Sequence, residues 1–266
     1  ADIGTRCDTE SADEACGQRI PDPRAFVAQL YEKLEQGHCA QLQVSQATVK
    51  YFMWKLCYYR PHAGSIPAFL YRLDRCTEAD MQAIVHYYNT LFTADVAGMT
   101  SFALFYNEVF SELWDHPSLR WPKYDEPLQN IYAETNVPLL MLQGVLDPST
   151  PYDFARGLED HFTGDHQHFV AFPWACHNVV SGSPVSSDPD ARTCAKQLWV
   201  DFVRDPEGAL DTSCVEQALP FDFSGENYGA YFFGTEDYWS ETKAGRGGLR
   251  RLPGELKTLE AALGDE

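Results

Sequence analysis

Two ionisable side chains follow two short apolar runs of the sequence. Asp147 lies three residues after Gly144, which ends the run 137–144, and His177 lies five residues after Phe172, which ends the run 166–172. An aspartate that accepts a hydrogen bond from imidazole Nδ1–H fixes the tautomer, so that Nε2 can take a proton from a nucleophile. The pair therefore predicts general-base chemistry, provided that the fold brings the two loops together.

The elements around these residues predict how they are positioned. A continuous apolar run that ends in glycine is typical of a strand buried on both faces of a parallel sheet. After the first run, Thr150 is expected to cap a helix that starts at Pro151 and ends before Gly164. The second run is the next strand, and another helix is expected to open at 188–189. Strand, helix, strand and helix in this order predict an α/β fold with a parallel sheet, in which loops at the carboxyl ends of neighbouring strands lie side by side.

The first hundred residues have a different pattern. Apolar residues recur at helical spacing over 23–35, 48–59 and 78–91, with Thr77 as the expected cap of the third helix and a break at 64–67. We divide the chain into a helical cap region (1–100), a C-terminal α/β part (101–215) and a C-terminal extension (216–266). The aromatic cluster 228–239 in the extension is expected to pack against the main body.

Composition excludes several classes of partner. The 266 residues include 20 Lys and Arg against 39 Asp and Glu, for a net charge of −19, and 44% are hydrophobic. No basic stripe could neutralise phosphates, so nucleic-acid binding is not expected, and an anionic membrane surface would repel the chain. No apolar run approaches the roughly 18 residues of a membrane-spanning helix.

Eight cysteines stand at positions 7, 16, 39, 57, 76, 176, 194 and 214, and none forms a C-x-x-C pair. An even count at scattered spacing favours disulfides and a secreted or lumenal location, with buried free thiols as the alternative. His161, His166 and His168 with Asp165 form no familiar ligand set, so no metal is expected.

Each candidate also has a simpler interpretation. An aspartate before proline is usually a turn residue, and a histidine in a loop usually lies on the surface; together, at the ends of two predicted strands, Asp147 and His177 favour catalysis. Glu112, with Glu108 and Asp115 nearby, could pair with the α-amino group of a peptide, although a solvated helix face explains these carboxylates as well.

Several segments carry a resemblance to a known family. VPLLMLQGVLDPSTPYDFARGL resembles the hG-x-x-D-x-x-T-P segment of the α/β-hydrolase peptidases of family S33, the tripeptidyl and prolyl aminopeptidases. FPWACHNVV resembles their G-x-G-H-G histidine loop, and CAKQLWVDFVRDPEGALDTSC the end of their C-terminal module. CYYRPHAGSIPAFLYRLDRC is similar to the cap region of their secreted protist and oomycete-like members. The likeness covers residues 7 to about 240. In the histidine loop, Trp174 and Ala175 stand where small glycines are usual, and Asn178 follows the histidine.

The resemblance implies an α/β-hydrolase fold with a helical cap and a Ser-His-Asp triad without a cofactor. His177 would be the base and later the acid, and Asp147 would orient it. The implied substrate is an oligopeptide that loses N-terminal residues or short peptides. The chain contains no G-x-S-x-G elbow for the serine. We therefore expect a C-terminal portion whose partner is the missing N-terminal half of the hydrolase, and which is inactive alone. The alternatives are another α/β-hydrolase, of esterase or epoxide hydrolase type, and a binding module without a nucleophile.

Three disulfides are expected. Cys57 would bridge to Cys76 across the turn near Pro67, Cys194 to Cys214, and Cys7 to Cys16. This leaves Cys39 and Cys176, which would be free or paired with the missing half.

Overall fold

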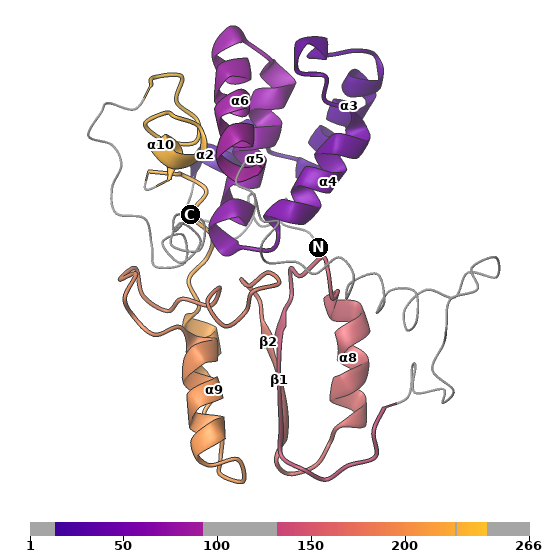
Figure 1. Ribbon diagram of the computed structural model, residues 1–266, viewed down its shortest axis with the longest axis vertical. Coiled ribbons are helices and arrows are strands. Elements are labelled where there is room, and N and C mark those ends of the chain that lie inside the picture. The colour runs from indigo at the N-terminus through magenta and orange to yellow at the C-terminus, as the bar shows by residue number, and fades with distance from the viewer. Residues whose placement is uncertain (1–13, 93–131, 227, 244–266) are drawn as a thin grey trace, which may run out of the picture.

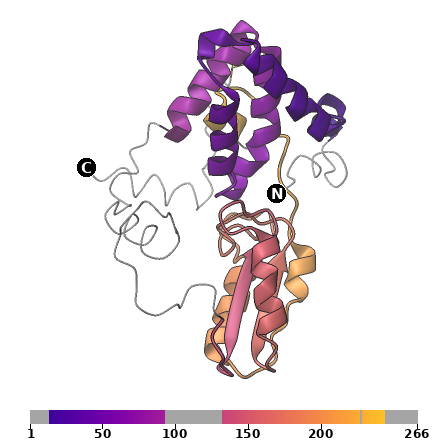
Figure 2. The same cartoon turned by 90° about the vertical axis from the view of Figure 1, so that its right-hand side faces the viewer.

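A computed structural model describes residues 14–92, 132–226 and 228–243. A group of helices built from the first part of the chain lies at one end, and a small sheet flanked by two helices lies at the other (Figure 1). Loops that follow the strands of the sheet lie between the two parts, as the perpendicular view also shows (Figure 2).

The helical part contains the elements expected there, with one difference. It consists of α2 (Glu14–Arg19), α3 (Pro23–Glu35), the 3-10 turn η1 (Ala40–Leu42), α4 (Gln46–Leu56), α5 (Arg60–Arg75) and α6 (Glu78–Phe92). The side chains of Asp22 and Ser45 cap α3 and α4 by accepting from backbone N–H groups in the first turn. Thr77 Oγ1 accepts from Asp80 N at 3.2 Å, so the predicted start of the third helix is confirmed.

The predicted break at 64–67 is wrong, because α5 runs through Pro67 without interruption. Proline inside a helix costs about 3 kcal/mol in isolation. Packing offsets this cost, since every residue from His62 to Leu70 is buried. Gly64 is the point of closest approach: a Cβ there would lie 2.6 Å from the backbone oxygen of Asp222.

The predicted parallel strand pair is confirmed. β1 (Leu139–Gly144) pairs with β2 (Gln167–Phe172), with Leu139 opposite Gln167 and Gly144 opposite Phe172. α8 (Tyr152–His161) covers one face and α9 (Cys194–Arg204) the other, which makes three layers (Figure 1). This arrangement is consistent with part of an α/β-hydrolase fold.

The two helices of the sheet part begin later than the sequence pattern predicted. α8 starts at Tyr152 with Pro151 as its cap, because the Thr150 hydroxyl is bonded to Asp147 instead. α9 starts at Cys194 rather than at 188–189. The side chain of Asp188 closes a local turn onto Asp190 N, and Thr193 supplies the cap of α9 through Lys196 N.

Aromatic residues from the end of the described chain complete the helical core. The 3-10 turn η4 (Ser213–Gln217) leads from the sheet part to α10 (Gly229–Phe232). Six aromatic residues that follow η4 are buried in the same core cluster as side chains of the helical part: Phe221, Phe223, Phe232, Phe233, Tyr238 and Trp239. Arg72, with an exposed fraction of 1%, donates to the backbone oxygens of Tyr238 at 3.1 Å and Ser240 at 2.7 Å. Described residues of the predicted extension, in 219–226 and 228–240, therefore pack onto the cap region.

One predicted disulfide is confirmed and one is wrong. Cys194 is bonded to Cys214, with their α-carbons 5.6 Å apart. Cys76 is bonded to Cys39, not to Cys57, with an α-carbon separation of 5.7 Å. The reason is the unbroken α5: its 16 residues span about 24 Å and separate Cys57 from Cys76. The predicted Cys7–Cys16 bridge involves Cys7, which lies outside the described residues. The two bridges fit an oxidising compartment.

Over the part of the chain that the structure describes, no helix has the length and apolar character needed to cross a membrane.

Candidate active site

Asp147 sits in a turn that satisfies both of its carboxylate oxygens. Its Oδ1 accepts from Ser149 N at 2.7 Å and from Thr150 N at 3.0 Å, the geometry of an Asx turn. Its Oδ2 accepts from Thr150 Oγ1 at 2.6 Å and from His177 Nδ1 at 2.8 Å. The two residues singled out in the sequence therefore meet at the carboxyl end of the sheet.

The surroundings of Asp147 favour its charged form. Burial alone would raise its pKa, since the side chain is only 3% exposed. Hydrogen bonds from Thr150, His177 and Ser149 outweigh that effect, and the pKa lies below its usual value. Asp147 is thus held as a carboxylate that can orient an imidazole and stabilise its protonated form.

Gly144 allows the two loops to touch. A Cβ at Gly144 would lie 2.1 Å from the backbone oxygen of Cys176 and 2.6 Å from that of Ala175. Leu146 N also donates to Ala175 O at 3.1 Å, which ties the two loops together directly. The glycine that ends the first apolar run is therefore required by the close approach of the histidine loop.

The histidine loop is also bonded to the helical part. His177 N donates to Cys57 O at 3.3 Å, and Asn178 N donates to Tyr58 O at 3.1 Å. Arg60 at the start of α5 donates to Trp174 O at 2.8 Å. These bonds hold the segment between α4 and α5 against the loop that carries the imidazole.

Aromatic rings lead from the surface of α4 to His177. The Tyr58 ring lies edge-on to the imidazole, with centroids 4.9 Å apart, and Trp54 lies edge-on to Tyr58 at 5.2 Å. Tyr51 follows Trp54 at 5.9 Å. Tyr51 and Trp54 are 50% and 38% exposed. These three residues, which we call the aromatic series, form an apolar approach to the imidazole.

The geometry of His177 suits proton transfer. Its Nδ1 is engaged by Asp147, and its side chain is 38% exposed. Within the described residues, the other ring nitrogen, Nε2, makes no hydrogen bond. An imidazole held in this way can take a proton at Nε2 from a nucleophile that approaches on the open side.

The other sequence candidates are not found at this centre among the described residues. Glu108, Glu112 and Asp115 lie outside the described residues. In the described ranges, no group of three or more His, Cys, Asp or Glu side chains is arranged to hold a metal ion. His161 instead bonds to the backbone oxygen of Ala133 at 3.2 Å.

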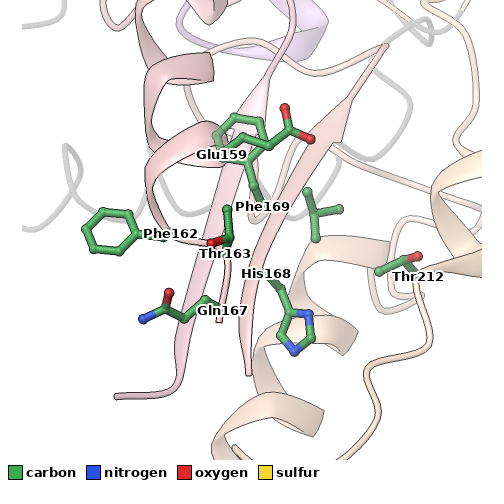
Figure 3. Close-up of a pocket in the computed structure, with 8 residues that line it drawn as sticks. Glu159, Phe162, Thr163, Gln167, His168, Phe169 and Thr212 are labelled. Atoms are coloured by element: carbon green, nitrogen blue, oxygen red, sulfur yellow. The ribbon is translucent and has the colours of Figure 1, made fainter. Parts of the chain in front are cut away.

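A cavity of about 350 Å³ lies elsewhere, along β2 (Figure 3). Neither Asp147 nor His177 lines it; its lining residues are Glu159, Phe162, Thr163, Gln167, His168, Phe169, Val170 and Thr212. It begins at the amino end of β2, whereas the Asp–His pair follows the carboxyl ends of both strands. We therefore place the candidate active site at the Asp–His pair.

Sequence reasoning missed two members of the site. Thr150, expected to cap α8, is a hydrogen-bond donor to Asp147, and Tyr58 packs on the imidazole from a distant segment. The signal for Thr150 is local, because a Thr three residues after an Asp in a turn can donate back to it. No local signal exists for Tyr58, which reaches His177 through tertiary packing.

One comparison with known proteins found a match. Residues 107–214 match the family model described as TAP-like protein, which belongs to the α/β-hydrolases. The match spans both strands, Asp147, His177 and the Cys194–Cys214 bridge. It supports a hydrolase of the peptidase or esterase type. Neither the curated proteins nor the solved structures compared with the chain gave a match.

Proposed function

We propose that this chain carries the His and Asp of a Ser-His-Asp hydrolase that cleaves N-terminal residues or short peptides from oligopeptides. The observation that carries the proposal is the hydrogen bond of 2.8 Å between His177 Nδ1 and an Asp147 carboxylate that three further donors hold in place. The TAP-like match supports the hydrolase class, and the resemblance of the sequence segments to family S33 supports the peptidase.

In the proposed reaction, His177 Nε2 takes the proton of a serine hydroxyl as the oxygen attacks the peptide carbonyl. The imidazolium, stabilised by Asp147, then gives this proton to the leaving amine, and an acyl-serine remains. Water attacks the acyl-serine with His177 again as base. This part of the reaction needs no cofactor.

The serine is proposed to come from a segment outside these 266 residues. The sequence has no G-x-S-x-G motif, and no described serine bonds to His177. The sheet supports such a partner: among the described strands, β1 pairs with β2 alone, although its residues LLML are apolar throughout. An apolar strand of this kind is typical of the interior of a parallel sheet, so further strands would complete it on the free edge of β1.

Two features favour a cationic, partly apolar substrate. The net charge of −19 attracts the protonated α-amino group of a peptide. The aromatic series offers apolar surface next to the imidazole for a substrate side chain.

The test uses the 266-residue chain assembled with the upstream segment of its gene product that carries a G-x-S-x-G motif. We expect the assembly to hydrolyse a tripeptidyl fluorogenic amide, His177→Ala to abolish turnover, and the 266-residue chain alone to be inactive. Hydrolysis of esters without amides would favour the esterase alternative. Turnover by the chain alone that survives His177→Ala would show that the chemistry lies elsewhere.

A further inference from the structure

Two thiols next to the candidate active site have no role in the proposed reaction. Cys57 caps the C-terminal end of α4, and Cys176 immediately precedes His177. Both are unbonded and buried, with exposed fractions of 6% and 1%. Both belong to the same core cluster, although 118 residues separate them in the sequence.

Backbone geometry places the two cysteines next to each other. His177 N, covalently bonded to the carbonyl of Cys176, donates to Cys57 O at 3.3 Å. Since the carbonyl oxygen and the following nitrogen each lie about 2.4 Å from their α-carbon, the two α-carbons are at most about 8 Å apart. Disulfides span roughly 4.4–6.8 Å between α-carbons, so a shift of an ångström or two at most is needed.

Electrostatics shows the same proximity. Burial raises the pKa of the Cys57 thiol to about 12. Burial is also the main cause that raises the pKa of Cys176, and repulsion from a charge on Cys57 adds to it. Both groups are therefore neutral thiols in the folded chain.

We propose that Cys57 and Cys176 form a disulfide when the chain is oxidised, so that the end of α4 is covalently joined to the loop that carries His177. The structure describes two disulfides, Cys39–Cys76 and Cys194–Cys214. An environment that oxidises these four cysteines also acts on Cys57 and Cys176. The backbone hydrogen bond from His177 N to Cys57 O keeps the two α-carbons close enough for a bridge to form after a small shift.

The oxidant is a small-molecule disulfide such as oxidised glutathione. One cysteine thiolate attacks it, forms a mixed disulfide and releases one glutathione thiolate. The second cysteine, after loss of its proton, attacks the mixed disulfide and releases the other glutathione. Two cysteines are oxidised, one glutathione disulfide is reduced to two thiols, and both protons pass to the released thiolates. Because the folded thiols are neutral, the reaction proceeds during folding or local opening.

The test is a disulfide map of the full 266-residue chain. The chain is refolded with oxidised and reduced glutathione, quenched in acid, and denatured with N-ethylmaleimide before proteolysis and mass spectrometry. We expect a cross-linked peptide pair that contains Cys57 and Cys176, with no maleimide on either. The Cys194–Cys214 peptides are the internal control for oxidation.

Two results would overturn the proposal: maleimide on both Cys57 and Cys176 while Cys194–Cys214 is bridged, or a bridge from either residue to a third cysteine. A thermal measurement gives an independent readout. We expect the Cys57→Ser/Cys176→Ser double variant to melt about 10 °C below the oxidised chain. Reducing conditions that leave Cys194–Cys214 intact should not change the melting temperature of this variant. Equal melting temperatures of the oxidised chain and the double variant would also contradict the proposed bridge.

Discussion

Replacing Asp147 by asparagine changes the donors and acceptors around His177 without changing the shape of the turn. The two backbone N–H groups, at 2.7 and 3.0 Å from Oδ1, require an oxygen at that position, so the new amide nitrogen must replace Oδ2. There it faces the Thr150 hydroxyl and His177 Nδ1, which lie 2.6 and 2.8 Å from Oδ2 in the parent chain. An amide NH₂ donates and cannot accept, so Nδ1 must become the acceptor and the ring proton must move to Nε2.

The shifted proton occupies the position that a base needs free. We expect Asp147→Asn to lower kcat of the assembled hydrolase by about 10⁴, the effect of the wrong tautomer in such triads, or roughly 5 kcal/mol of barrier. The loss of unfolding free energy should be smaller, about 1–3 kcal/mol. Bonds to a carboxylate are lost, but the amide still donates to Nδ1 and to the Thr150 hydroxyl.

The tautomer can be measured on the 266-residue chain without any activity. Long-range ¹H–¹⁵N spectra of the imidazoles should show His177 protonated at Nδ1 in the parent chain and at Nε2 in Asp147→Asn, at a pH where the ring is neutral. Asp222→Asn is the matched control, because Asp222 Oδ1 closes a similar turn onto Ser224 N and Gly225 N without a histidine partner. An unchanged tautomer in Asp147→Asn, or an Nε2–H form in the parent chain, would refute the reasoning.

Three further outcomes are expected. Because the folded pKa of Asp147 lies below its unfolded value, its stabilising effect is present above about pH 4 and is lost as the pH falls through the folded pKa; urea unfolding should show the difference between the parent chain and Asp147→Asn shrinking from pH 6 to pH 2. Gly144→Ala should cost about 3 kcal/mol or more and shift the amide resonances of the histidine loop, since the new Cβ meets the backbone oxygen of Cys176 at 2.1 Å; a loss below 1 kcal/mol by urea unfolding would contradict this. Arg72→Met should cost about 3–5 kcal/mol in the same assay, because it weakens the pairing of the buried Asp80 carboxylate, and an additional Asp80→Asn should recover part of the loss.

The sequence predicted well the features that depend on local patterns. The two apolar runs and their spacing to Asp147 and His177 were sufficient to predict a parallel pair and the meeting of the two side chains. These features follow from two rules. Strands buried on both faces are apolar throughout, and functional loops gather at the carboxyl ends of parallel strands.

Features that depend on distant packing were not predictable in this way. Pro67 would break an exposed helix, and the burial of Pro67 and its neighbours offsets that cost in α5. The wrong Cys57–Cys76 bridge followed from that expected break. The contact of Tyr58 with His177 likewise joins segments more than a hundred residues apart, for which no spacing rule exists.

The late aromatic segment on the helical part has a consequence for biosynthesis. The side chains that seal α5 and α6 around Arg72 leave the ribosome about 150 residues after α6, which at roughly 5–20 residues per second is a delay of about 7–30 s. The strands and helices of the sheet part, by contrast, are contiguous in the chain and are synthesised within that interval. The nascent helices must therefore wait with an open apolar face, which is the kind of surface that chaperones recognise, and the first half of the chain to be made is the last to be closed.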